Sequence, residues 1–193
     1  MKKKTGIKVR YENMNKIIFV TTNKGKLQEA REILGIEVEG LELEIDEAQT
    51  LDPIECVEKK AETAYAKAKQ SILVEDTCLF FEAWNGLPGV FINYFMKTLD
   101  NEGLIRLMKG EENREAKAQT TFCYFDGKEK ITAIGETKGI ISEKPRGDNG
   151  FGWDSIFIPE NSEKTFAEMS NEEKNKISMR KMALEELKTK LSI

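Results

Sequence analysis

The first part of the chain alternates between strand-like and helix-like spacing of apolar residues. Lys16–Thr21 is a run of β-branched and aromatic residues, and it predicts a buried strand. A helical pattern follows, with apolar residues every three or four positions up to Leu34 and with Gly35 at the usual position of a C-terminal cap. This segment therefore predicts a strand, a polar loop and a helix.

The next segment begins with a set of helix-start residues. Asp52 suits the N-cap, Pro53 the first helical position and Glu55 the third position of a capping box, and the apolar stripe ends near Gln70. The short apolar run Ser71–Glu75 then predicts a second strand. Because a strand, a helix and a strand at this spacing favour a parallel pair, we expect an α/β core.

The second half of the chain predicts further elements of both kinds. Asp126-Gly127 indicates a type I′ hairpin between two strands, and Ser170 with Glu173 predicts a capping box at the start of one C-terminal helix. We expect short helices over Phe91–Leu99 and Leu104–Met108, strands over 116–125, 131–141 and 156–158, and a glycine-rich loop over 145–154.

Composition narrows the possible chemistry more than it narrows the fold. The chain of 193 residues contains no histidine, which excludes Ser-His-Asp and Cys-His catalysis and any metal site with a histidine ligand. Its three cysteines, Cys56, Cys78 and Cys123, are odd in number and far apart, so we expect free thiols. A metal ion therefore requires oxygen ligands, which favours magnesium, manganese or calcium.

Charge is unevenly distributed along the chain. The net charge is −4, although residues 1–13 carry five basic side chains, so the remainder is clearly acidic. An acidic body disfavours a dedicated nucleic-acid binder. We expect residues 1–15 to form a disordered basic extension, with an RNA-binding or targeting arm as the alternative. No apolar run approaches the roughly 18 residues of a membrane span, so we expect a cytoplasmic protein without a membrane partner.

Two polar segments are candidates for binding a charged phosphate group and its metal ion. The loop Thr21–Lys26 combines a helix N-terminus with two lysines, which suits an anion, although a capped helix with solvated lysines is the simpler explanation of the loop taken alone. Glu75 and Asp76 follow a buried strand, with Glu47 upstream. Carboxylates gathered in one cleft favour a hard cation, and the alternative is a strand that ends in polar residues.

Two further segments are candidates for binding a base. Phe151-Gly152-Trp153-Asp154 places aromatic rings beside an acid, which suits stacking on a nucleobase and bonding to its edge, or else a core-packed aromatic pair. Lys174, Ser178 and Arg180 add donors on the last helix. The four segments together contain what a nucleoside triphosphate needs.

The order of these motifs resembles that of the inosine triphosphate pyrophosphatase family. The resemblance covers about residues 16–191 and rests on five segments: Thr21–Lys26, Val74–Leu79, Gly86–Gly89, Phe151–Asp154, and Thr165–Met169 with Glu173–Asn175. It implies one pyrophosphatase domain over residues 16–193, with an elongated, two-lobed mixed sheet flanked by helices and an active-site cleft between the lobes. It also implies a homodimer that uses Mg²⁺, or Mn²⁺ in its place, to hydrolyse ITP, dITP and XTP to the monophosphate and pyrophosphate.

The resemblance also assigns roles to individual residues. Glu47 and Asp76 would ligate the metal, Asp76 or Glu75 would orient the attacking water, and Lys26 and Lys60 would stabilise the leaving group. The residues expected to bind substrate are Thr21, Thr22, Asn23, Lys24, Gly25, Lys26, Lys60, Asp76, Thr77, Phe151, Gly152, Trp153, Asp154, Lys174, Met179 and Arg180.

One departure from the family pattern affects base recognition. Where the family has Ser-His-Arg, this chain has Ser178-Met179-Arg180, so the histidine beside the base is replaced by an apolar side chain that can pack against the ring. Two alternatives therefore stay open. One is a pyrophosphatase for other modified or standard nucleotides, and the other is a non-catalytic nucleotide- or RNA-binding relative.

Overall fold

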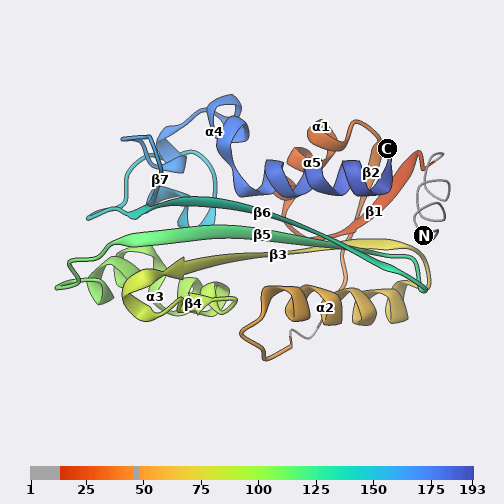
Figure 1. Ribbon diagram of the computed structural model, residues 1–193, viewed down its shortest axis with the longest axis horizontal. Helices are drawn as coiled ribbons and strands as arrows, with labels where there is room; N and C mark the ends of the chain where they lie inside the picture. The colour runs from red at the N-terminus through yellow and green to blue at the C-terminus, as the bar shows by residue number, and fades with distance from the viewer. Residues whose placement is uncertain (1–13, 46–47) are drawn as a thin grey trace, which may run out of the picture. The chain divides into compact units, whose positions relative to one another are not determined.

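The structure is a computed structural model that describes residues 14–45 and 48–193. Over these residues the strands form one mixed seven-stranded sheet in the order β2-β1-β3-β5-β6-β7, with β4 paired to β3, and helices flank it (Figure 1). The predicted α/β class is confirmed. The strands are β1 (Lys16–Val20), β2 (Glu37–Leu41), β3 (Ile72–Phe81), β4 (Pro88–Gly89), β5 (Glu115–Phe125), β6 (Lys130–Ile141) and β7 (Phe157–Pro159). The helices are α1 (Lys24–Leu34), α2 (Pro53–Ala68), α3 (Ile92–Leu107), α4 (Asn171–Ile177) and α5 (Met179–Leu191).

The chain divides into two compact units. Unit 1 takes in the described residues up to Asp76, together with Thr121–Gly135 and Lys181–Ile193; unit 2 takes in Thr77–Thr120 and Glu136–Arg180. Strands β3, β5 and β6 contribute residues to both. The predicted cleft between two lobes stays a prediction.

The predicted N-terminal extension lies mostly outside the described residues, which begin at Met14. Met14 packs against the apolar core of unit 1, and the carbonyl of Asn15 accepts a hydrogen bond of 3.1 Å from the N–H of Glu37. Both residues are therefore held by unit 1.

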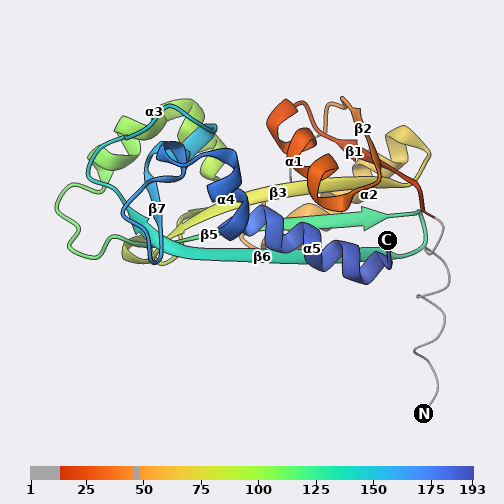
Figure 2. The ribbon, with the colours of Figure 1, turned by 90° about the horizontal axis from the view of Figure 1, so that it is seen from above.

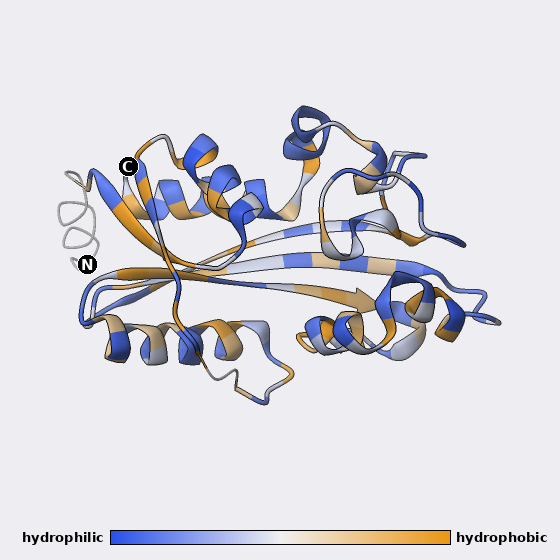
Figure 3. Ribbon diagram, turned by 180° about the vertical axis from the view of Figure 1, so that it is seen from behind, coloured by the Kyte–Doolittle hydropathy of each residue, from blue (hydrophilic) through white to orange (hydrophobic). Residues whose placement is uncertain are grey.

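Helices cover both faces of the sheet within unit 1. Helices α1 and α5 lie on one face and α2 on the other (Figure 1), and α5 runs along β6 (Figure 2), where the carbonyl of Thr132 accepts from Lys190. Side chains along each strand alternate between the two apolar cores, as Phe19 faces α1 and α5 whereas Val20 faces α2. The sheet of unit 1 is consequently buried on both sides, which explains why β1 is almost continuously hydrophobic (Figure 3).

Strand β2 was not predicted from the sequence. It pairs in parallel with β1, and its residues alternate between charged and apolar, so the acidic segment after Gly35 has the pattern of an edge strand. Lys16 of β1 lies 3.6 Å from Glu37 and 2.5 Å from Glu39, and these ion pairs explain the acidic residues.

Three other predictions are wrong in their details. Strand β3 continues to Phe81 instead of ending at Glu75, because Thr77–Phe81 is itself a run of good strand formers. Asp52 caps α2 alone, since the carboxylate of Glu55 accepts from Thr50 instead of completing a capping box. The hairpin turn spans 126–129 and is not type I′, because its aspartate has no positive φ and its carboxylate accepts from the two N–H groups that follow Gly127.

The prediction of a single C-terminal helix is also wrong, because this part of the chain forms two helices, α4 and α5. Ser170 and Glu173 form the predicted capping box at the start of α4. Ser178 then takes an extended backbone with φ −76° and ψ 142°, and Thr137 donates to the carbonyl of Ile177 at 2.9 Å, which caps the end of α4. This break sets the direction in which α5 begins.

No described helix has both the length and the apolar character that a membrane crossing requires.

Candidate active site

The loop between β1 and α1 is fixed by two side chains of its own. The Asn23 side chain accepts from the N–H of Lys26 at 3.0 Å, and Thr21 Oγ1 accepts from the N–H of Asn23 at 3.1 Å. Asn23 is thus the N-cap of α1, and the exposed residues Lys24 and Gly25 open its first turn. A helix start of this kind directs backbone N–H groups outward, which suits the oxygens of a phosphate. Thr22, also predicted to bind substrate, is exposed in the same loop.

The acidic pair of β3 lies in the middle of the strand, with its two side chains on opposite faces of the sheet. Glu75 Oε1 lies 2.9 Å from Lys26 Nζ of α1, whereas Asp76 Oδ1 lies 3.8 Å from Lys60 Nζ of α2. Successive side chains of a strand point in opposite directions, so the two carboxylates do not share one metal ion by direct adjacency. Each carboxylate contacts a lysine of a different helix, and the predicted roles of both at the metal stay predictions.

The two acidic side chains also differ in accessibility. The Glu75 side chain is 1% exposed and Asp76 is 14% exposed, and the Lys60 side chain beside Asp76 is 17% exposed. Asp76 therefore combines access to solvent with a looser contact to its lysine. Of the two carboxylates, Asp76 is the one that an incoming cation can reach.

The oxygen donors near Asp76 are few among the residues that the structure describes. No group of three or more acidic or cysteine side chains there is arranged to hold a metal ion. Glu47, the other predicted ligand, lies outside the described residues. Magnesium retains several waters and is commonly held by one or two carboxylates together with substrate phosphates. A single accessible aspartate with Lys60 beside it fits that mode of binding.

The predicted base-binding residues belong to unit 2 and surround a short 3-10 turn, η2 (Gly152–Ser155). Asp154 Oδ2 accepts from the N–H of Phe151 at 2.8 Å and from Lys174 Nζ at 2.7 Å. The side chains of Asp154 and Lys174 are each 5% exposed. This ion pair is therefore buried beneath the loop. Lys174 can influence a bound base only indirectly, by supporting the loop.

Phe151 is half-buried and lies over two cations. Lys174 Nζ is 4.9 Å from the centre of its ring and Arg180 Cζ is 5.4 Å from it. Such contacts orient an aromatic ring and stabilise it by about 0.5–2 kcal/mol. Trp153 packs edge-on against Phe157 in the core of unit 2, so of the two aromatic residues Phe151 is the one placed to stack on a base.

The start of α5 brings the remaining predicted residues to the same loop. Arg180 is buried, and its Nη2 donates to Thr77 Oγ1 at 3.2 Å. Met179 is 2% exposed and belongs to the apolar core of unit 2. The side chain that replaces the family histidine therefore fills the core instead of offering a polar atom.

Some residues that hold this loop were missed from the sequence. Asn149 Nδ2 donates to the carbonyl of Met169, and its N–H donates to the carbonyl of Ala167. Asn101 of α3 donates to the carbonyl of Gly152 and to Ser155. Gly150 has φ +78°, and a Cβ there would lie 2.2 Å from Asp154 Oδ2. The only sequence signal for Asn101 is its place in the polar gap between two predicted helices.

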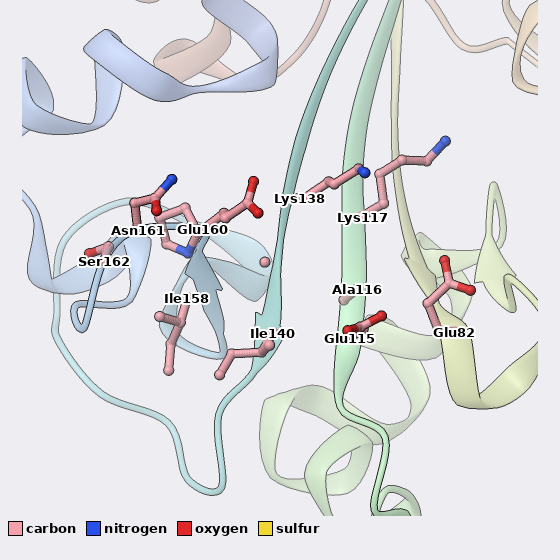
Figure 4. Close-up of a pocket in the computed structure, with 12 residues that line it drawn as sticks. Glu82, Glu115, Ala116, Lys117, Lys138, Ile140, Ile158, Glu160, Asn161 and Ser162 are labelled. Atoms are coloured by element: carbon pink, nitrogen blue, oxygen red, sulfur yellow. The ribbon is translucent and has the colours of Figure 1, made fainter.

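Unit 2 also has a hollow of about 460 Å³ on β5, β6 and β7. Lys117 and Lys138 lie beside each other on neighbouring strands, with Glu115 and Glu82 on one side and Glu160 on another (Figure 4). Three carboxylates against two lysines do not suit a triphosphate, and Lys117 is 2.7 Å from Glu136. None of the predicted site residues lines this hollow.

The cysteines take no part in the site. All three are free, as predicted, and all three are buried. Burial raises the pKa of Cys123 to about 12, so its thiol is neutral at pH 7 and is not a nucleophile.

Comparison with known proteins identifies the family. Residues 17–190 match the model of the Ham1 family. A dITP/XTP pyrophosphatase of Methanopyrus kandleri is 45% identical over 88% of this chain and 93% of its own length, and an inosine triphosphate pyrophosphatase of Yarrowia lipolytica is 42% identical over 91% and 95%.

Solved structures agree with this result. A HAM1 protein from Coxiella burnetii, 28% identical, superposes with a TM-score of 0.82 over 93% of this chain and 99% of that chain. The Ham1 protein of Staphylococcus aureus, 25% identical, gives a TM-score of 0.79 over 92% and 98%. The sequence and the fold therefore agree that this chain belongs to the Ham1 family.

Proposed function

We propose that this chain hydrolyses non-standard purine nucleoside triphosphates, namely ITP, dITP and XTP, to the monophosphate and pyrophosphate. The observation that carries the proposal is the identity of 41–45% over about nine tenths of the chain with relatives named dITP/XTP or inosine triphosphate pyrophosphatases. The residues that the resemblance assigns to the phosphates and to the base each gather within one unit, which supports the same conclusion.

Unit 1 supplies the groups for the triphosphate. The first turn of α1 offers backbone N–H groups and the ammonium group of Lys26 to the phosphates, and Lys60, beside Asp76, offers the ammonium group that neutralises charge developing on the pyrophosphate leaving group. Phosphoryl transfer depends mostly on such positioning and charge neutralisation. Asp76 is the accessible carboxylate that can orient or deprotonate the attacking water, and no histidine competes for that role.

We also assign a magnesium ion to this reaction. Asp76, and Glu47 by the resemblance, would hold it, with substrate phosphates and water completing its shell. Bound there, the ion supplies charge neutralisation on phosphate oxygens and a lowered pKa of a bound water. Manganese has the same preference for oxygen ligands and is the expected substitute.

Unit 2 supplies the groups for the base. Phe151 stacks on the purine, and the buried guanidinium of Arg180 donates to the 6-keto oxygen of hypoxanthine or xanthine. Adenine presents a 6-amino donor at that position, which cannot accept a hydrogen bond from a guanidinium, and a polar site discriminates strongly on that basis. Met179 offers no hydrogen bond to a base. The second candidate function is therefore a pyrophosphatase that accepts a wider range of bases.

A panel of nucleoside triphosphates tests this proposal. We expect release of pyrophosphate from XTP, ITP and dITP that depends on added Mg²⁺ and stops with a chelator, and much slower release from ATP and GTP. Equal rates with ATP would favour the broader pyrophosphatase. Tight binding of XTP without turnover at any concentration of Mg²⁺ would favour a non-catalytic binder.

Two further parts of the proposal concern assembly and location. We expect a homodimer in the cytoplasm, as the resemblance implies. Sedimentation velocity of the purified chain checks the first, since a monomer of 22.0 kDa and its dimer are well separated. Fluorescence microscopy of a tagged chain in its host checks the second.

A further inference from the structure

Helix α3 is interrupted at one residue, and the interruption faces the base-binding loop. Asp100 has φ 56° and ψ −169°, a backbone conformation that residues other than glycine rarely adopt. Its carboxylate accepts from the N–H of Gly103 at 3.0 Å, so Asp100 acts as the cap of a second helical segment. Backbone strain of this kind persists where the surrounding structure requires it, often at functional sites.

The residue directly after this break bonds both ends of η2. Asn101 Nδ2 donates to the carbonyl of Gly152 at 2.9 Å and to Ser155 Oγ at 2.9 Å. Asn101 Oδ1 is buried and has no hydrogen-bond partner among the described residues. A buried acceptor without a partner is unfavourable. The two hydrogen bonds that Nδ2 donates therefore hold the amide in this orientation against that cost.

The geometry points to a specific role, and we propose that Asn101 is a positioning residue that sets base selectivity through Phe151. Gly152 directly follows Phe151, so the bond to its carbonyl fixes the Gly152–Trp153 peptide plane, one residue beyond the stacking ring. The bond from the Phe151 N–H to Asp154 fixes the other side. Asn101 itself touches neither base nor phosphate, and it acts through the loop. This inference rests on the proposed function of that loop.

The test compares two Asn→Asp substitutions within unit 2. Asn101→Asp keeps the size of the side chain but places a carboxylate oxygen against the Gly152 carbonyl, so the bond is lost. Asn171→Asp makes the same change at an exposed position of α4 and is the control. For Asn101→Asp we expect the KM for XTP to rise about tenfold, with kcat within about twofold, since one buried hydrogen bond is lost. The preference for XTP over ATP falls by a similar factor.

Two readouts separate this role from a general loss of structure. Inorganic tripolyphosphate carries no base, so its inhibition constant is expected to stay unchanged in Asn101→Asp. A parallel rise in that constant, or an unchanged KM and base preference, would overturn the proposal. If Asn101→Asp does not fold, Ser155→Ala removes one of the two bonds and is expected to shift KM about threefold in the same direction, and an unchanged KM in this variant would overturn the proposal equally.

A measurement without substrate keeps this inference distinct from the proposed function. The chain has two tryptophans, Trp84 and Trp153, so Trp84→Phe leaves Trp153 of the loop as the single tryptophan, which can be excited selectively. Because Trp153 is buried, we expect acrylamide quenching to rise with Asn101→Asp and not with Asn171→Asp. Unchanged quenching would refute the positioning role even if the wild-type chain hydrolyses XTP. Increased quenching in a chain without XTP turnover would refute only the proposed function.

Discussion

Unit 1 and unit 2 each place lysines beside carboxylates, but they do so in different ways. In unit 1, Lys60 and Asp76 are partly exposed and 3.8 Å apart. In unit 2, Lys174 and Asp154 are 2.7 Å apart and almost fully buried. A loose, accessible pair can exchange its partner for a phosphate or a cation, whereas removing one member of a buried pair leaves an uncompensated charge. Under the proposed function, the same residue types would therefore serve chemistry at Asp76 and loop rigidity at Asp154.

The largest effect on activity is expected from the accessible aspartate of unit 1. Asp76→Asn removes a negative charge from the site of the metal and the water, and we expect kcat for XTP to fall roughly 10³-fold. Thermal unfolding should change little, because the lost ion pair is loose. Pyrophosphate release at saturating XTP and a melting curve measure the two effects. Activity within a few-fold of wild type would remove Asp76 from the catalytic role.

For the buried pair of unit 2, Lys174 and Asp154, we expect a substitution to lower stability more than it lowers activity. Lys174→Met leaves the carboxylate of Asp154 buried without its cation, which costs about 3–5 kcal/mol in the free energy of unfolding. The control on the same helix is Lys176→Met, which removes an exposed pair with Glu172 and costs at most about 0.5 kcal/mol. Chemical denaturation measures both. Equal losses in the two variants would contradict the distinction drawn between the units.

Lys26 tests whether a partly exposed lysine of unit 1 contributes to binding and to stability separately. Lys26→Met is expected to lower kcat/KM for XTP by roughly 10–100-fold, since a charge-assisted contact to phosphate is lost. It also removes the cation 2.9 Å from the buried Glu75, so the chain should become less stable. Adding Glu75→Gln should restore stability without restoring activity. Recovery of activity in the double variant would show that Lys26 serves only to neutralise Glu75.

The smallest expected effect is a pH-dependent change in stability at the capping box of α4, the helix that carries Lys174. The bond from the Ser170 N–H, followed by the contact with Lys164, lowers the pKa of Glu173 to about 2. Because the folded pKa lies below the unfolded value of about 4.3, this stabilisation is present above pH 4.3 and is lost as the pH falls toward 2. Denaturation of Glu173→Gln and wild type across this range checks the sign. The gap between them should narrow with falling pH, and a gap that widens would contradict it.

Local signals predicted the loop and helix that bind phosphate in this proposal. The strand Lys16–Val20, the cap at Asn23 and the left-handed Gly35 lie within twenty consecutive residues, so spacing and cap chemistry suffice to place them. The capping box of Ser170 and Glu173 was predicted for the same reason.

The faces of Glu75 and Asp76 could not be predicted in the same way. Their placement depends on β3 continuing to Phe81, and the sequence of the acidic pair reads equally well as the end of a strand. The lysines that balance them come from two different helices, which only the folded sheet brings to opposite faces.

The contacts that hold the base-binding loop depend on residues even more distant in the chain. Asn101 and Gly152 are 51 positions apart, and their bond requires the break at Asp100. The break at Ser178 was hidden by an apolar spacing that runs on through both α4 and α5. Tertiary contacts, which local propensity does not contain, decided both.

Phosphorus NMR of XTP hydrolysis tests the central claim most directly, because it identifies the bond that is broken. With Mg²⁺ and the wild-type chain, we predict XMP and pyrophosphate in equal amounts, and neither product with Asp76→Asn over the same time. Formation of XDP with orthophosphate would place the cleavage at the terminal phosphate and contradict the account.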